Sequence, residues 1–143
     1  LPCWKAHCKF TFSNQLQTIG REAFFGCSSL RTVFLPDSIT DLGDGAFSSC
    51  SSLSSARLPC SLEKVPDALF DSCGLNRIFL PDSITTIGAS AFYGNKNLTE
   101  VSHFSKNLKV IENDAFANSL QLIGKRALGE IGTAIESRGS NLL

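Results

Sequence analysis

The sequence predicts an α/β-type repeat solenoid, in which each repeat adds one short strand to a parallel β-sheet. The hexapeptide LPDSIT occurs at residues 35–40 and again at 80–85, 45 residues apart. A phenylalanine also recurs every 22 to 24 residues, with a short alternating apolar segment between successive copies. Such a period indicates stacked units, because a unit of this size cannot bury its apolar side alone. The recurring phenylalanines are Phe24, Phe47, Phe70, Phe92 and Phe116.

The alternating segment predicts a strand with one buried face. It reads LRTVFLPDSIT in one repeat and LNRIFLPDSIT in another, and apolar residues alternate over its last positions. A period of two is typical of a half-buried strand, so Val33 and Leu35 should point inward and Thr32 and Phe34 outward. The proline that follows has no N–H to donate, and Asp-Ser favours a turn, so the strand should end there.

Two more positions of the repeat are predicted to be structural. The phenylalanines should stack along the interior, one ring per coil, each stabilising the fold by roughly 1.5–3 kcal/mol. Gly20, Gly43 and Gly88 share one position of the repeat, and glycine there suggests a bend with positive φ. The same position holds Pro66 and Glu112, and proline cannot adopt a positive φ, so the bend does not require one.

The repeat resembles the BspA-like, or Treponema-type, leucine-rich repeat, which reads approximately L-x-x-I-x-L-P-x-S-V-T-x-I-G-x-x-A-F-x-x-C. The match covers residues 10 to about 122. The resemblance implies a short parallel sheet on a concave face, an irregular convex side, and a role as a recognition scaffold, commonly at a microbial surface. It names no particular ligand.

The end of the chain departs from this pattern. LQLIGKRAL at 120–128 copies LQTIGREAF at 16–24, but the strand half of that repeat is missing. Apolar residues then recur at helical spacing from Ile123 to Ile131, which predicts a C-terminal helical cap over the open sheet edge. The predicted organisation is an N-terminal cap with an incomplete first repeat at 1–15, leucine-rich repeats of 22–24 residues at 16–122, and a truncated repeat with a C-terminal cap at 123–143.

The six cysteines fall into three groups. Cys27, Cys50 and Cys73 share one repeat position, where we expect reduced thiols inside the coil, although neighbouring coils bring such Cα atoms within disulfide range. Cys60 falls in an exposed turn. The remaining pair, Cys3 and Cys8, lies in the segment CWKAHC. In an extracytoplasmic protein we expect a disulfide between them that closes the end cap. The alternative is a Cys/His metal site, for which this segment lacks a fourth ligand.

Several function classes are disfavoured. The formal net charge is zero and no basic cluster is visible, so nucleic acid is not expected as a partner, and no apolar run could span a membrane. No catalytic motif is present, and His103 aligns with Leu35 as a polar residue in an irregular coil. We therefore predict no enzyme, catalytic residue, metal or cofactor. Because the chain starts at Leu1 and lacks methionine, we expect a processed or trimmed product without its targeting segment.

The outward strand residues form the candidate partner-binding site on the predicted concave face. Two phenylalanines flank an arginine whose guanidinium could stack on either ring, and these residue types dominate binding hot spots. Alternatively, the rings only add strand propensity and cover the sheet. The central row comprises Thr11, Phe34, Arg57, Phe79 and Ser102, with Thr32, Ser55, Arg77 and Glu100 alongside it.

The leading functional hypothesis is therefore a non-enzymatic protein-binding module, active in adhesion or recognition at the cell surface or in the periplasm. Two alternatives remain open at this point. The solenoid could self-associate as a structural element, or a small hydrophobic ligand could bind between the aromatic row and the coil at His103 and Phe104.

Overall fold

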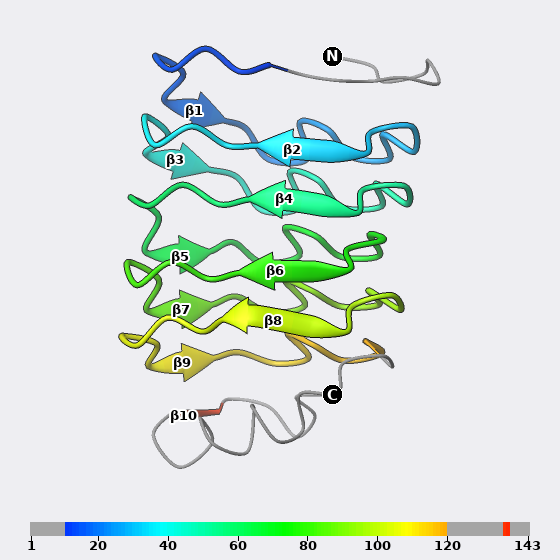
Figure 1. Cartoon of the computed structure of the whole chain (residues 1–143), viewed down its shortest axis with the longest axis vertical. Helices are drawn as coiled ribbons and strands as arrows, with labels where there is room; N and C mark the ends of the chain where they lie inside the picture. Colours follow the sequence, from blue (N-terminus) through cyan, green and yellow to red (C-terminus); the bar gives the residue numbers. More distant parts are fainter. Residues whose placement is uncertain (1–10, 120–135, 138–143) are drawn as a thin grey trace.

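The computed structural model describes residues 11–119 and 136–137, which form a parallel β-solenoid of about four coils (Figure 1). The strands of the coils form two columns. The first column holds β2 (Thr32–Phe34), β4 (Ser55–Arg57), β6 (Arg77–Phe79) and β8 (Glu100–His103). The second holds β1 (Thr18–Ile19), β3 (Asp41–Leu42), β5 (Lys64–Val65), β7 (Thr86–Ile87), β9 (Val110–Ile111) and β10 (Glu136–Ser137).

Strand pairing is parallel throughout the described residues, as expected for stacked coils that run in the same sense. In the first column β2 pairs with β4 and β6 with β8. In the second, β1 pairs with β3, while β5, β7, β9 and β10 form one continuous sheet. The second column was not predicted, because strands of two residues are too short to show an alternation in the sequence.

The predicted strand faces are confirmed. Val33 and Leu35 are 1% and 0% exposed, whereas Thr32 and Phe34 lie on the solvent side of β2. The same alternation recurs in β6, where Ile78 is buried between two exposed residues. The inward residues belong to a single core that runs through all the described coils.

The predicted phenylalanine stack is also confirmed. Neighbouring rings lie 5.1 to 5.9 Å apart between centroids, in stacked geometry. Phe12 closes the described N-terminal end of this stack with an edge-on contact to Phe24, 5.8 Å between centroids. Each ring therefore has apolar neighbours above and below, which ties the coils together along the interior.

Nearly every residue of the repeated hexapeptide makes a contact that stabilises the fold. Leu35 and Ile39 are fully buried, and the hydroxyl of Ser38 donates to the Leu16 carbonyl of the preceding coil at 2.6 Å. The Thr40 hydroxyl donates to another carbonyl of that coil, and the Asp37 carboxylate accepts the N–H of Cys60 in the next coil at 2.8 Å. LPDSIT thus recurs because five of its side chains form the core or bridge adjacent coils.

The turn that carries the phenylalanine has a regular backbone. The residues two before and two after each ring all have positive φ, including seven that are not glycine. Between these turns, N–H groups donate to carbonyls of the following coil, as in the bond from Phe24 to Ala46 at 2.7 Å. The residues with positive φ are Glu22, Gly45, Ala68, Ser90 and Asp114 before the ring, and Gly26, Ser49, Ser72, Gly94 and Asn118 after it.

The shared glycine position does not need positive φ, as predicted from Pro66 and Glu112. At two of the three glycines, Gly43 and Gly88, the position is closely packed instead. A Cβ atom at Gly88 would lie 2.7 Å from the backbone nitrogen of Asp67, and one at Gly43 would collide with the backbone of Arg21. Adjacent coils approach most closely at these points.

The predicted C-terminal helix, between Ile123 and Ile131, lies outside the described residues. Glu136–Ser137 lies inside them, and β10 pairs there with β9 along the second column. The predicted outer segments at 1–15 and 123–143 fall largely outside the described residues, so the three-part organisation of the chain stays a prediction.

Candidate functional site

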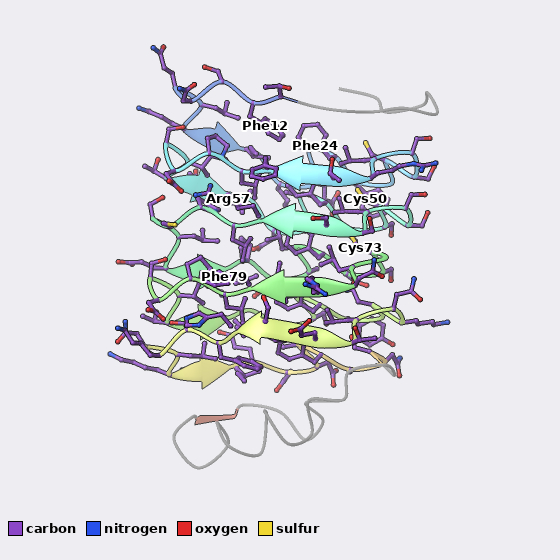
Figure 2. The ribbon with its side chains drawn as sticks, in the orientation of Figure 1. Phe12, Phe24, Cys50, Arg57, Cys73 and Phe79 are labelled. Carbon is purple, nitrogen blue, oxygen red and sulfur yellow. The ribbon has the colours of Figure 1, made fainter. Side chains whose placement is uncertain are left out.

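The solvent side of the first column carries the predicted aromatic row. Strand register places Phe34 beside Arg57 and Phe79 beside His103. The two phenylalanines are 69% and 53% exposed, which is unusual for such large apolar side chains. Arg57 and Phe79 come from β4 and β6, which lie next to each other in the stack (Figure 2). We call Phe34, Arg57, Phe79 and His103, with the neighbouring outward residues Thr32, Ser55, Arg77 and Glu100, the aromatic face.

One member of the predicted row is corrected. Sequence alignment placed Ser102 in the row and His103 at the buried Leu35 position, but β8 pairs His103 with Phe79. The register shifts between Ile78 and Phe79, which accommodates the extra residue of the longest repeat as a bulge. Ser102 remains exposed, and its hydroxyl donates to the Ile78 carbonyl at 3.3 Å.

This shift brings an imidazole onto the aromatic row. The His103 ring stacks on Phe79 with centroids 4.7 Å apart and an angle of 17° between the planes. The Nε2 atom of His103 lies 2.9 Å from the Asp82 carboxylate. Phe79 therefore has one face covered by a neighbouring ring and remains about half exposed on the other side.

The sequence allowed the Arg57 guanidinium to stack on either phenylalanine ring, but in the structure it does not. Its guanidinium donates to the Leu35 carbonyl at 2.8 Å and to the Asp37 carboxylate at 3.0 Å. With these bonds the Arg57 side chain is 38% exposed, less than the phenylalanines on either side. Asp37 was not predicted to belong here, because it lies 20 residues earlier in the chain, at the turn of the preceding coil.

The aspartates beneath the row are electrostatically similar. The N–H of Cys60 and the Arg57 guanidinium lower the pKa of Asp37. The N–H of Lys106 and the side chain of His103 likewise lower the pKa of Asp82. Both carboxylates are hydrogen-bonded in their charged form, which is the state that such bonds favour.

The second row of the aromatic face contains the other predicted residues. Register confirms that Thr32 lies beside Ser55 and Arg77 beside Glu100. The last two form an ion pair at 3.5 Å. Thr11 is exposed but lies before β1, outside any described strand. The arginines of the aromatic face are thus paired with carboxylates, whereas its two phenylalanine rings are exposed and have no such partner on their solvent side.

The buried cysteines have a structural role. The Cys50 thiol donates to the Phe24 carbonyl at 3.2 Å and the Cys73 thiol to the Phe47 carbonyl at 3.0 Å. Asn95 and Ser119 make the equivalent bonds in later coils. The side-chain hydrogen bond with Cys50, together with burial, raises the pKa of the Cys73 thiol. The predicted position of the thiols inside the coil is therefore confirmed for Cys50 and Cys73.

Other predicted chemistry lies elsewhere or outside the description. Cys60 is exposed in its turn, as expected, whereas Cys3 and Cys8 lie outside the described residues. Within residues 11–119 and 136–137, no three side chains of metal-binding type come together. In the same part of the chain, no helix is long and apolar enough to cross a bilayer.

The fold and the exposed strand face define a repeat scaffold of the leucine-rich type. Comparison with family models matches residues 4–123 to the BspA type leucine rich repeat region, in six copies. The chain therefore belongs to the BspA-type leucine-rich repeat family, as the sequence resemblance indicated. This family and fold are typical of protein-interaction modules without enzymatic activity, and the described residues give no indication of catalysis.

Solved structures support the same fold. A leucine-rich cell surface protein from Faecalibacterium prausnitzii A2-165 is 25% identical, with a TM-score of 0.66 over 92% of this chain and 32% of that one. A leucine-rich repeat protein from Eubacterium ventriosum is 25% identical, with a TM-score of 0.72 over 80% of this chain and 31% of that one. The T. pallidum leucine-rich repeat protein is 27% identical, with a TM-score of 0.52 over 91% of this chain and 51% of that one.

The chain thus spans between about a third and a half of these structures. The comparison with curated proteins gave no match.

Proposed function

We propose that this chain is a non-enzymatic protein-binding module that recognises its partner through the aromatic face. The observation that carries the proposal is the exposure of Phe34 and Phe79, which lie on β2 and β6, on either side of β4 in the first column. Exposed aromatic residues grouped on a structured surface are typical of interaction sites, whereas scattered ones are not. The family, whose members are typical interaction modules, supports the same function.

The charge pattern of the face indicates what kind of contact it makes. The two arginines, Arg57 and Arg77, each have a carboxylate partner within 3.5 Å. Because these charges are already compensated, the two phenylalanine rings should provide most of the binding free energy. We therefore expect an apolar patch on the partner and an affinity that depends weakly on salt.

A location at the cell surface or elsewhere outside the cytoplasm forms part of this proposal. Its support is the family membership and the similar protein from F. prausnitzii, which is described as a cell surface protein. Adhesion or recognition of a protein on another cell is the role that fits such a location.

The test is a binding screen against extracellular-matrix and cell-surface proteins with three forms of this chain. The wild type should bind a partner that the Phe34→Ser/Phe79→Ser variant does not bind. Phe25→Ser is the matched control, because Phe25 is 57% exposed but lies on the turn beside the buried stack rather than on the aromatic face. Its binding should equal that of the wild type. A partner retained by the double variant would contradict the proposal.

Thermal melts of the three proteins complete the experiment. Replacing exposed rings should leave the melts nearly unchanged, so a loss of binding can be assigned to the surface itself. Light scattering over a dilution series separates binding of a foreign partner from self-association, because a self-associating solenoid would lose mass on dilution.

A small hydrophobic ligand at His103 and Phe104 is less well supported. Phe104 packs against the core, and the ring of His103 lies on Phe79. These contacts occupy the space in which the ligand would have to lie.

A further inference from the structure

The second column of strands is interrupted at one junction. Between β1 and β3, the N–H of Gly43 donates to the Ile19 carbonyl at 2.8 Å. Gly88 and Glu112 make the same bond one and two coils after β5, at 2.8 and 2.9 Å. Between β3 and β5, no backbone hydrogen bond links the strands within the described residues, and no Cα atom of β3 lies within 8 Å of one in β5.

The sequence explains this interruption. The residue at the Gly43 position of the next coil is Pro66, which has no N–H to donate to Leu42. Repeat length is not the cause, because β5 follows β3 by 23 residues, the same offset as between β1 and β3. A second position also differs. The Thr40 hydroxyl donates to the preceding coil, whereas the aligned residue one coil later is Glu63.

The interruption leaves a hollow of about 350 Å³ on the side of the solenoid, which we call the slot. Its ends are closed by the hydrogen bonds from Ser61 to Ile39, at 3.0 Å, and from Gly45 to Asp67, at 2.9 Å. Figure 1 shows β3 and β5 as successive strands of the second column, with a wider interval between them than between β5 and β7. The residues that line the slot are Thr40, Asp41, Leu42, Asp44, Ser61, Leu62, Glu63, Lys64 and Pro66.

The slot holds β3 and β5 farther apart than paired strands, because no Cα atom of one lies within 8 Å of the other. Paired strands lie about 4.8 Å apart, so two strands with a third between them are separated by roughly 9.6 Å. Within such a ladder, successive residues turn their backbone groups to opposite sides. Because Asp41 bonds back to Gln17 and Val65 accepts from Gly88, the N–H and C=O groups of Leu42 and Lys64 are directed into the slot.

The charges around the slot identify the chemistry of an occupant. Asp41, Asp44 and Glu63 line it and form no ion pair with any described residue. The lysine of the lining, Lys64, is already bridged to Asp67 at 3.3 Å and to Glu112 at 3.7 Å. The rim is therefore acidic, while Leu42, Leu62 and Pro66 supply an apolar floor.

We propose that the slot binds a short extended peptide segment of a partner protein, which adds the missing strand between β3 and β5. About three residues fit, with an apolar side chain directed inward and basic side chains directed to the acidic rim. The segment would exchange backbone hydrogen bonds with Leu42 and Lys64. This site does not depend on the aromatic face and can fail or succeed without it.

The probe is the capped peptide Ac-Gly-Lys-Val-Lys-Gly-NH₂, titrated into isotopically labelled protein and followed by amide chemical shifts. We expect saturable shifts confined to residues 40–44 and 61–66, with a Kd of about 1 mM or tighter. The same peptide with glutamate in place of lysine should bind at least about tenfold more weakly, since it repels the rim. Methylation of the valine nitrogen should abolish binding, because it removes a donor needed by the strand edge.

Variants of the protein locate the site. Pro66→Gly restores the missing N–H, so β3 should pair with β5, protect the new amide from exchange, and exclude the peptide. Asp41→Asn/Glu63→Gln should weaken binding about tenfold, while Asp71→Asn/Asp114→Asn, which removes two charges elsewhere, should not. The proposal is overturned by shifts that map outside the slot, by shifts that survive both Pro66→Gly and N-methylation, or by no shifts at all, which would mean that water alone fills the slot.

Discussion

The stacked turns that carry the phenylalanines, which we call the turn column, and the second column of strands connect the same two coils in different ways. At the turns, Gly45, Phe47 and Ser49 donate to the next coil over 2.7 to 3.1 Å. On the other side of the same coils, β3 and β5 share no backbone hydrogen bond. The turn column tolerates many side chains because each donor position needs only a backbone N–H. The strand column opens at Pro66, where that N–H is missing.

The largest expected effect comes from the turn column. Phe47 is fully buried and stacked between Phe24 and Phe70, at 5.1 and 5.9 Å. Phe47→Ala should lower the free energy of unfolding by about 3–5 kcal/mol, because it removes buried surface and leaves a cavity between two rings. Denaturant unfolding measures this change. Phe25→Ala, at an exposed ring, should shift it by less than about 0.5 kcal/mol, and equal losses would remove the stack from its structural role.

A second variant transfers the open junction to another coil. Gly88→Pro removes the N–H that donates to Val65 and places a ring where even a Cβ atom would lie only 2.7 Å from that carbonyl. We expect a loss of about 3 kcal/mol and faster amide exchange in β7. Gly88→Ala keeps the donor and isolates the steric part. Gly20→Ala, where no atom lies within 4 Å, should be nearly neutral.

A third variant tests the donor beneath the turns. The amide of Asn95 donates to the carbonyls of Phe70 and Phe92, at 2.8 and 2.9 Å, and accepts from the N–H of Leu75 at 3.2 Å. Asn95→Ala should cost about 1–3 kcal/mol, because buried polar groups lose their partners. Thermal unfolding checks this. Asn95→Ser should recover part of the loss, since Ser119 makes the equivalent bond.

The smallest effect concerns acid stability. Hydrogen bonds from Lys106 and His103 lower the pKa of Asp82 in the folded state. The carboxylate therefore stabilises the fold above its unfolded pKa of about 3.9, and this contribution is lost as pH falls through the lower folded value. Asp82→Asn should flatten the pH dependence of the melt in this acidic range. Asp41→Asn is the control, and an unchanged profile for Asp82→Asn would contradict the prediction.

The sequence predicted those features that repeat with every coil. The faces of β2 and the ring stack follow from apolar spacing, which is the same in each copy. The position of His103 does not follow, because an additional residue can be inserted at several points of a repeat, and only the pairing with Phe79 locates it. The contact of Arg57 with Asp37 was missed for a related reason, since it joins two coils.

The opening between β3 and β5 was also beyond sequence analysis. Pro66 was recognised as incompatible with a positive φ, but its missing N–H matters only when the facing carbonyl of Leu42 is known. The second column itself consists of two-residue strands, and these carry no periodic signal. Features that depend on a single pair of facing residues need the stacked structure.

The bonds of the turn column all run in one direction. From Glu22 to Gly94, every such N–H points to the following coil and every accepting carbonyl to the preceding one. Peptide dipoles aligned in this way add along the solenoid axis, as they do along a helix. The turn column is therefore electrically polar along its length. A further coil or a second copy could continue this column only head to tail, because a twofold end-to-end contact would oppose donors to donors.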